Sequence, residues 1–259
     1  MLNRRSFVGM LGGFGAMPFS AVSVPAPEKR RLFILEQYYL KNGTQAGRIN
    51  DYCKAAIPML NKYHNGPKIV LEALVAPHMP QIAIILGFES TDDLCSTQAK
   101  ILEDKNLSKA LEEWENHAEQ PYEHFSTSLL EATEYCPEIK PEPSPRQIPR
   151  IFELRTYHSP TFRQLKALHE RFAGPEIKIF HRTGIHPILY SSMLVGQNMP
   201  NLTYVIPFDN LDGREKAWAA FSADPEWIKV RAESIEKSGQ ISSTNQISLY
   251  RATPYSPIR

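Results

Sequence analysis

The chain has 259 residues, of which 42% are hydrophobic and 22% are charged, and its formal net charge at pH 7 is +1. These values are typical of a globular protein and exclude an intrinsically disordered chain, and the length suits one large domain or two of ordinary size. Because the charges nearly balance and no long run of lysine or arginine occurs, nucleic acid is not expected as a partner.

The first thirty residues have the pattern of an export signal. Arg4 and Arg5 stand side by side in NRRSFVG, which resembles a twin-arginine export motif, and a glycine-rich apolar stretch follows over residues 7–24. Ala21 and Ser23 then supply the small residues of a signal-peptidase site. We therefore predict that residues 1–30 form a twin-arginine-type signal segment and that the protein is exported to the periplasm or another extracytoplasmic compartment.

The alternative for this segment is an uncleaved membrane anchor, because about 18 apolar residues can span a bilayer. Pro18 and four glycines within the stretch make a spanning helix less stable and favour cleavage. No later apolar run is long enough to span a bilayer. Contact with a membrane is therefore expected only through an uncleaved signal segment.

Export would carry the three cysteines, Cys53, Cys95 and Cys136, into a compartment where disulfides persist. An odd number leaves at least one thiol free or paired with another chain. Neither a C-x-x-C motif nor a cysteine–histidine spacing typical of metal ligands occurs. We therefore predict no metal site.

The rest of the chain contains an internal repeat. MPQIAIILGFES, which starts at Met79, resembles MPNLTYVIPFDN, which starts 120 residues later at Met199. The same spacing relates SLLEATEY to SLYRATPY, and a spacing of 119 relates RLFILEQYY to RIFELRTYH. Similarity at both ends and in the middle of the repeat indicates two copies of one structural unit.

The repeat sets the domain boundaries. The first unit is expected at residues 31–136 and the second at residues 150–255. The segment 137–149 between them contains five prolines. Because proline fixes φ and favours an extended chain, we predict a semi-rigid linker there.

Hydrophobic periodicity alternates between strand and helix within each unit. RIFELRTYH alternates as a strand does, with Phe152 on one face and Glu153 on the other. Asn210 and Asp224 are favourable N-caps for two later helices, and Pro225 suits the first position of the second. In chain order, the second unit is expected to contain a strand at 150–158, a helix at 161–180, strands at 187–195 and 202–208, a helix reaching 221, a helix from 225 and a strand at 244–252.

This order, β-α-β-β-α-α-β, is a split βαβ arrangement of the ferredoxin-like, α+β kind. A four-stranded antiparallel sheet with helices on one face leaves its other face uncovered. We expect that face to be substantially apolar, with Ile34 and Tyr38 in the first unit and Tyr157 in the second, and such a face is rarely left in water. Two equivalent sheets can cover each other, so we expect the two units to pair their sheets within one chain.

Two segments of the second unit, IFELRTYHSP and TYVIPFDNLDGREKAWAAFSADPEW, resemble the NIPSNAP family. The resemblance is good over residues 150–252 and weaker over 31–135, where Leu107 takes the position of Trp227. NIPSNAP proteins are similar to the dimeric α/β-barrel superfamily, in which two ferredoxin-like units pair their sheets into a barrel. The resemblance implies an intrachain dimeric α/β barrel, and it implies the fold far more firmly than a function.

The same resemblance implies a ligand site inside the barrel, on the uncovered face of the sheets. We expect Glu36 and Arg155, which hold equivalent positions in the repeat, to point inward. In the structural interpretation they form an ion pair between the units. In the functional interpretation, Arg155 faces an anionic or carbonyl-bearing ligand and a tyrosine donates a hydrogen bond. The ligand-binding candidates are Glu36, Tyr38, Glu153, Arg155, Tyr157 and Tyr204.

Three histidines require the same comparison of roles. His169 lies near the apolar stripe of its predicted helix and is expected to be a hydrogen-bonded core or boundary residue. His181 and His186 flank a predicted turn at Gly184 and are weaker ligand-binding candidates, able to bind a metal or haem only if both point inward. Because no nearby cysteine or carboxylate completes a ligand set, we predict no cofactor and keep haem as an alternative.

The sequence contains no Ser-His-Asp order, glycine-rich phosphate loop or H-E-x-x-H motif, so hydrolase, kinase and NAD-dependent functions lack support. The superfamily that the chain resembles includes cofactor-poor monooxygenases and haem-using enzymes. One hypothesis is an exported protein that binds a small apolar or anionic ligand in its barrel and could act as a cofactor-poor oxygenase. The other is a non-catalytic interaction or structural protein. Further homodimerisation of the tandem unit is compatible with both.

Overall fold

The computed structural model describes residues 31–140 and 146–259 of the chain. The expected signal segment at 1–30 lies outside the described residues, as do residues 141–145 of the predicted linker. Within the described ranges, no helix combines the length and the apolar character needed to cross a membrane.

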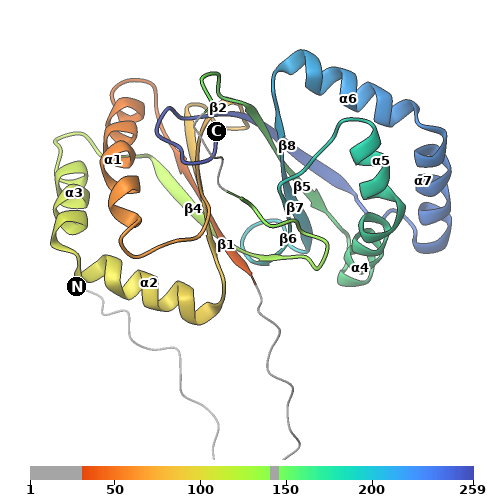
Figure 1. Cartoon of the computed structure of the whole chain (residues 1–259), viewed down its shortest axis with the longest axis horizontal. Coiled ribbons are helices and arrows are strands. Elements are labelled where there is room, and N and C mark those ends of the chain that lie inside the picture. The colour runs from red at the N-terminus through yellow and green to blue at the C-terminus, as the bar shows by residue number, and fades with distance from the viewer. Residues whose placement is uncertain (1–30, 141–145) are drawn as a thin grey trace, which may run out of the picture.

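Two units with the same order of strands follow each other along the chain (Figure 1). The first comprises β1 (Leu32–Tyr39), α1 (Gln45–Leu60), β2 (Lys68–Val75), β3 (Gln81–Phe88), α2 (Thr91–Glu103), α3 (Lys105–Glu115) and β4 (His124–Ala132). The second comprises β5 (Ile151–His158), α4 (Phe162–Arg171), η1 (Phe172–Glu176), α5 (Ile177–Arg182), β6 (Leu189–Val195), β7 (Asn201–Phe208), α6 (Leu211–Ala223), α7 (Pro225–Ser238) and β8 (Thr244–Ala252).

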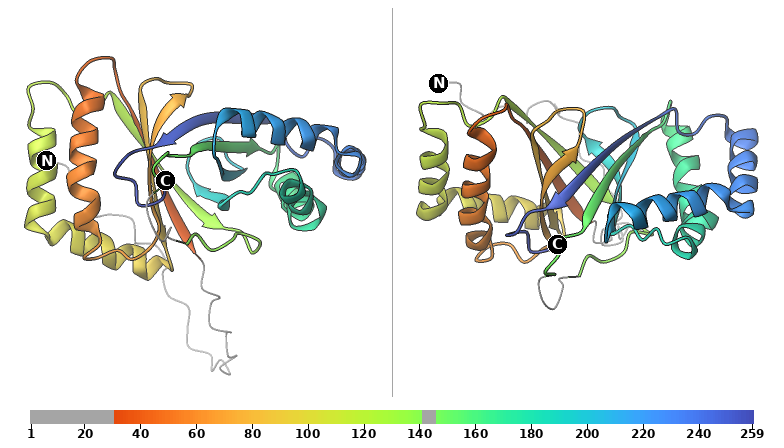
Figure 2. Two further views of the ribbon diagram at one scale, coloured as in Figure 1. Left: turned by 45° about the horizontal axis from the view of Figure 1, so that its top comes forward. Right: turned by 90° about the horizontal axis from the view of Figure 1, so that it is seen from above.

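The strands of the described residues form one closed antiparallel barrel in the order β1-β3-β2-β8-β5-β7-β6-β4. Each unit supplies four adjacent strands, and the edge strands pair between units, β2 with β8 and β4 with β6. The helices of the first unit lie on one side of the barrel and those of the second on the opposite side (Figures 1 and 2). The predicted α+β fold, two ferredoxin-like units paired within one chain, is confirmed. Closure also leaves neither sheet with an unpaired edge.

Local sequence accounts for the boundaries of the helices. Asn210 accepts a hydrogen bond from the backbone N–H of Gly213 at 2.8 Å and caps α6, as predicted. Asp224 caps α7 by accepting a hydrogen bond from a backbone N–H of the first helical turn. The single helix predicted at 161–180 is wrong in one respect. The chain passes through the π-helical turn η1, where Gly174 has a ψ of −114° and Pro175 interrupts the backbone hydrogen bonding.

The two units are related by pseudo-two-fold symmetry, and a β-bulge occurs at the same place in each. β2 gains one residue at Leu74 where it pairs with β8, and β6 gains one at Leu194 where it pairs with β4. These two positions are 120 residues apart, so both seams between the units carry the same β-bulge. A bulge bends its strand and increases the local twist, which helps the two sheets to close into a barrel.

The end of each unit crosses to the other unit. After β4, the hydroxyl of Tyr135 is hydrogen-bonded to Nδ1 of His169 on α4 at 2.7 Å. After β8, the hydroxyl of Tyr255 donates to Oδ1 of Asn50 on α1, also at 2.7 Å. The two tyrosines are equivalent in the repeat, and so are His169 and Asn50. The units are therefore tied together by a reciprocal exchange of their C-terminal segments.

The cysteines are free thiols, with Cys53 and Cys136 buried and Cys95 exposed. Burial raises the pKa of the Cys53 thiol to about 12 and also raises the pKa of Cys136. Both buried residues therefore remain protonated and unreactive at neutral pH. No disulfide therefore forms within the described part of the chain, and the expectation that at least one thiol is free or paired with another chain stays a prediction.

Candidate functional site

The two faces of each strand lead to different surroundings. In β1, Leu35, Gln37 and Tyr39 point into the barrel lumen, and in β5 Leu154 and Thr156 do so. The residues between them point toward the helices, because successive side chains of a strand leave on opposite sides. The lumen therefore receives side chains from equivalent positions of both units.

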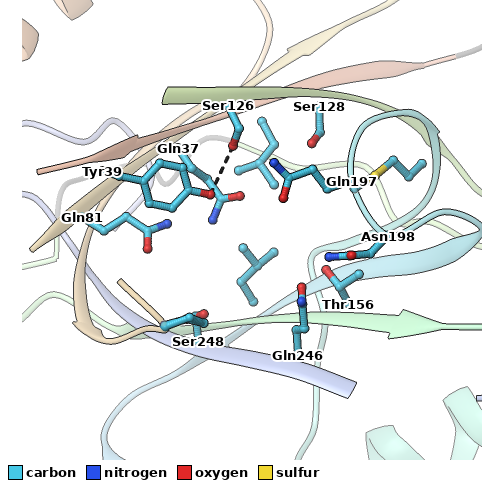
Figure 3. A pocket seen from close by; sticks show the side chains of 14 residues that line it. Gln37, Tyr39, Gln81, Ser126, Ser128, Thr156, Gln197, Asn198, Gln246 and Ser248 are labelled. Atoms are coloured by element: carbon cyan, nitrogen blue, oxygen red, sulfur yellow. Dashed lines mark hydrogen bonds between the residues drawn. The ribbon is translucent and has the colours of Figure 1, made fainter. Parts of the chain in front are cut away.

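One half of the lumen contains a cavity of about 190 Å³ (Figure 3). The other half is filled by buried apolar side chains, among them Phe33, Leu71 and Ile85. Both units contribute to the cavity, which is lined by Leu35, Gln37, Tyr39, Pro77, Gln81, Ser126, Ser128, Leu154, Thr156, Met193, Gln197, Asn198, Gln246 and Ser248.

The cavity has a mainly apolar floor beneath a polar collar. Leu35 and Leu154 lie two residues deeper along their strands than Gln37 and Thr156, and Met193 completes the apolar part of the floor. The hydroxyls of Ser128 and Ser248 lie at the same depth, because these residues pair with Leu35 and Leu154. Amides and hydroxyls make up the collar, and among the described residues no Asp, Glu, Lys, Arg or His side chain lines the cavity. The site is therefore rich in hydrogen-bonding groups but carries no charge at neutral pH.

Some collar groups are already hydrogen-bonded within the protein. Gln81 Nε2 donates to the hydroxyl of Tyr250 at 2.9 Å, and Gln37 Nε2 donates to the same hydroxyl at 3.3 Å. The hydroxyls of Tyr39 and Ser126 are 3.2 Å apart and share a hydrogen bond, which Figure 3 shows. These contacts fix the first-unit side of the collar.

Other collar groups have unused hydrogen-bonding capacity. Within the described residues, the side chains of Ser128, Gln197, Asn198 and Gln246 make no hydrogen bond to the protein. An amide side chain offers two donor hydrogens and two acceptor lone pairs. These groups are available to water or to a bound molecule, and all except Ser128 belong to the second unit.

The β6–β7 hairpin holds two of these amides over the cavity. Asn198 has a φ of +57°, a left-handed conformation that asparagine tolerates better than most residues. The buried side chain of Asn201 donates to the backbone carbonyl oxygens of Asn198 at 2.9 Å and Gln197 at 3.2 Å. Its Oδ1 in turn accepts a hydrogen bond from Thr203 at 3.0 Å. Asn201 therefore fixes the position of the hairpin above the collar.

Replacing Asn201 by alanine is expected to lower the free energy of unfolding by about 2 kcal/mol, because buried partners lose their hydrogen bonds. Amide hydrogen exchange in the hairpin should also become faster, since two of its carbonyl oxygens are released. Urea unfolding and exchange measured by mass spectrometry check the two effects. Thr203→Val is the control that keeps both bonds from Asn201 to the hairpin and removes the bond to Oδ1, together with the bond between the hydroxyls of Thr203 and Thr156. It should leave exchange in the hairpin almost unchanged. Equal exchange in wild type and Asn201→Ala would contradict the role of Asn201.

The residues predicted to line the barrel lie on its outer face instead. The strand alternation is as predicted, but the face assigned to the lumen is the wrong one. The layer beneath the helices supplies charged and aromatic partners, such as Arg214 and Trp218, that the neutral lumen lacks. Whether any of these residues binds a ligand stays a prediction. The residues placed on the helix side are Glu36, Tyr38, Glu153, Arg155, Tyr157 and Tyr204.

Glu153 is the centre of a buried ion cluster beneath α6. Its carboxylate accepts hydrogen bonds from Arg155 Nε at 2.5 Å, Arg214 Nε at 2.8 Å and Trp218 Nε1 at 2.9 Å. The guanidinium of Arg155 also lies 3.7 Å from the centre of the Trp218 ring and donates to the Tyr157 hydroxyl at 2.7 Å. Each charge in the cluster has partners within the protein, which favours a structural role.

Glu36 does not meet Arg155, so the predicted ion pair between the units is wrong. Arg155 pairs with Glu153 on its own strand, whereas Glu36 accepts a hydrogen bond from the Tyr38 hydroxyl at 2.9 Å. Tyr38 packs edge-on against Trp114 of α3, with ring centroids 5.9 Å apart. Burial raises the pKa of Glu36, and the hydrogen bond from Tyr38 opposes this shift.

Tyr157 and Tyr204 belong to an aromatic cluster beneath the second-unit helices. Their ring centroids are 5.1 Å apart, and both rings also contact Phe172 of η1. Burial raises the pKa of both hydroxyls, so they remain protonated. Their observed role is to pack the sheet against the helices.

The histidines differ in their surroundings. His181 and His186 are exposed near the end of α5, with ring centroids 5.2 Å apart, so the structure does not place them in the barrel. Among the described residues, no group of three or more His, Cys, Asp or Glu side chains is arranged to hold a metal ion. His169 is hydrogen-bonded through both ring nitrogens, to Tyr135 at 2.7 Å and Ser192 at 2.8 Å. Its predicted role as a hydrogen-bonded boundary residue is confirmed.

The polar lining of the lumen has a signal in the sequence that the prediction did not use. Gln37 and Thr156 stand at equivalent positions, 119 residues apart, and each follows an apolar residue of the same face, Leu35 or Leu154. A polar residue at the same place on both otherwise apolar strand faces indicates that this end of the lumen is polar and accessible to water. The last strand of each unit carries the same signal, since Ser126 and Gln246 are equivalent and both polar. Gln197 and Asn198 have no such signal, because they lie between strands and correspond to Pro77 and His78.

Comparison with solved structures shows that the fold is shared over both units of the chain. An anthrone oxidase-like protein is similar at 14% identity and a TM-score of 0.54, with 88% of this chain and 92% of that chain covered. A candidate monooxygenase from Fusobacterium nucleatum has 7% identity and a TM-score of 0.58, with 86% and 92% covered. A second candidate monooxygenase, from Lactobacillus acidophilus, has 10% identity and a TM-score of 0.51, with 86% and 94% covered.

Comparison with protein families gives a match in the second half of the chain. The NIPSNAP family model matches residues 152–257, which corresponds closely to the second unit defined by the repeat. No curated protein matches the sequence. The resemblance inferred from the sequence is thus confirmed for the second unit, which matches the NIPSNAP family and forms one half of a tandem α/β barrel.

Proposed function

We propose that the protein binds a small molecule in the lumen of its barrel. The observation that carries this proposal is the convergence of hydrogen-bonding side chains without protein partners, Ser128, Asn198 and Gln246 among them, on one cavity. Ligand sites commonly combine an apolar wall with a few polar groups that orient the ligand. The apolar floor and polar collar have this composition.

The size of the cavity limits the ligand. An engineered cavity of about 150 Å³ in another protein takes up benzene. At about 190 Å³, the lumen cavity suits one ring with a short substituent, or a molecule of similar size. Larger ligands would have to extend beyond the mouth of the barrel.

Cofactor-poor oxygenation is a second candidate function, supported by two fold relatives that are candidate monooxygenases. The lumen gives binding more support than catalysis. Among the described residues that line the cavity, Tyr39 is the only one with a titratable side chain. It is therefore the only candidate for a general acid or base there. A non-catalytic interaction or structural protein is the opposing alternative, and an empty lumen that takes up no small molecule would favour it.

Export is part of this proposal and rests on the sequence of residues 1–30 alone. Cell fractionation with N-terminal sequencing of the mature chain tests it: a mature N-terminus near Val24 supports a cleaved signal, and an intact Met1 supports an anchor or a cytoplasmic protein. Sedimentation of the mature chain tests whether the tandem unit dimerises further.

Blocking the lumen is expected to abolish small-molecule binding. Ser126→Phe places a ring in the collar, whereas Thr127→Phe places the same ring on the outer, exposed face of the same strand. Ligand-observed NMR with fragments of neutral, anionic, cationic and apolar character measures binding to each variant. The proposal requires at least one fragment that binds the wild type and Thr127→Phe but not Ser126→Phe. Binding of no fragment, or equal binding to all three proteins, would refute it.

A further inference from the structure

The lining of the lumen cavity favours a ligand without charge. Of the residues that the structure describes, five amide and five hydroxyl side chains surround the cavity and no charged side chain lines it. An ion placed there would lose part of its hydration without meeting an opposite charge, which is costly. Neutral amides and hydroxyls can instead both donate hydrogen bonds to a ligand and accept them from it.

The groups available to a ligand are not distributed evenly. The two amides of the first unit, Gln37 and Gln81, both donate to the hydroxyl of Tyr250. The three amides of the second unit make no side-chain hydrogen bond within the described part of the chain. Of these, Asn198 and Gln246 come from different elements, the β6–β7 hairpin and β8. Recognition of a polar group therefore falls to the second unit.

The mouth of the barrel has the same asymmetry. On the first-unit side, the rings of Tyr39, His78 and His124 pack together, with Tyr39 centroids 5.3 Å from His78 and 4.5 Å from His124. On the second-unit side, the collar residues Asn198 and Gln246 also line a neighbouring pocket of about 210 Å³ that contains His158 and Thr244. A ligand can therefore enter on the second-unit side, past the free amides, whereas packed rings close the first-unit side of the mouth.

From these observations, and resting on the proposed function, we infer that the ligand is a neutral molecule with an amide-like edge, in which a hydrogen-bond donor lies beside an acceptor. Its polar edge lies against Asn198 and Gln246, and its apolar part lies against the floor formed by Leu35, Leu154 and Met193. One ligand binds per chain, because the pseudo-two-fold copy of the polar site is occupied by packed rings.

Four probes of nearly equal size and different polarity test this inference: benzamide, benzoate, benzylamine and toluene. Their affinities for the full chain are measured by isothermal titration or ligand-observed NMR at low and high salt. Benzamide is expected to bind at least about tenfold more tightly than each of the other three. Gln246→Leu should reduce this preference about tenfold without weakening toluene, since it removes hydrogen bonds and retains the volume.

Gln246→Glu is the second variant, and it should shift the preference from benzamide toward the benzylammonium ion, because it adds a carboxylate to the collar. A preference of the wild type for benzoate or benzylamine would overturn the neutral class, and a preference for toluene would overturn the amide-like edge. Either result would leave the lumen site in place. Benzamide binding that neither Gln246 variant changes would overturn the assigned orientation. Absence of binding by all four probes, together with no difference between Ser126→Phe and Thr127→Phe, would overturn the lumen site itself.

Discussion

Replacing Glu153 by isoleucine is expected to lower the free energy of unfolding by about 3–5 kcal/mol. The carboxylate is fully buried and is shared by Arg155, Arg214 and the indole of Trp218. Without it, Arg155 keeps a buried positive charge whose remaining partners are the Tyr157 hydroxyl and aromatic rings. Arg214 is less affected, because it also contacts Glu215. Denaturant unfolding followed by circular dichroism measures the loss.

The repeat supplies the matched control for this experiment. Ile34 holds the position in the first unit that Glu153 holds in the second, so isoleucine at this place is compatible with the fold. The double variant Glu153→Ile, Arg155→Met removes both charges of the pair. It should recover most of the lost stability, since apolar replacement of a buried ion pair is often neutral. A double variant as unstable as the single one would assign the effect to lost packing rather than to an unpaired charge.

His169→Asn is expected to make the protein more resistant to acid. Burial lowers the pKa of His169 from its usual value of 6.5 to about 4. As the pH falls below 6.5, the unfolded chain binds a proton that the folded chain does not bind until about pH 4. The wild type should therefore lose up to about 3 kcal/mol of stability through this residue over that interval, and asparagine should not.

Asparagine is the appropriate replacement because Asn50 makes the equivalent hydrogen bond to Tyr255 in the first unit. The quantity to measure is the difference in unfolding free energy between variant and wild type, at neutral pH and near pH 4.5. The difference is required because Glu176 also changes the stability of the protein over this pH range. Burial raises the pKa of Glu176 to about 7, so its protonation stabilises the folded state of both proteins as the pH falls. A difference that stays the same at both pH values would show that His169 titrates as it does in the unfolded chain.

The fold could be predicted because both halves of the chain show the same order of strand and helix patterns. The similarity between the segments at Met79 and Met199 indicates the size of the unit. The strand and helix periods of RIFELRTYH and of the segments that follow it indicate the order of the elements. The observed strands β5, β7 and β8 begin within one residue of the predicted positions. Local caps at Asn210 and Asp224 set the helix starts in the way that isolated helices are capped.

The orientation of the strands could not be predicted from alternation alone. Alternation shows that Phe152 and Glu153 lie on opposite faces, but both faces of β5 are buried in this barrel. A charged residue such as Glu153 is compatible with either interior if partners are present, and those partners, Arg214 and Trp218, come from a helix sixty residues later. Alternation therefore does not tell which of the two buried faces is turned to the lumen, because the partners that decide it are distant in the sequence.

The covalent joining of the two units has an evolutionary consequence for the lumen. In a barrel built from two identical subunits, each substitution appears twice, so a residue that improves one side of a central site also changes the other. In this chain, position 39 is a tyrosine while its counterpart at 158 is a histidine, and position 126 is a serine while its counterpart at 246 is a glutamine. When the two units are joined in one chain, the lining of the lumen no longer has to be symmetric. The second-unit side can then recognise the ligand, while the aromatic rings of the first-unit side close the entrance.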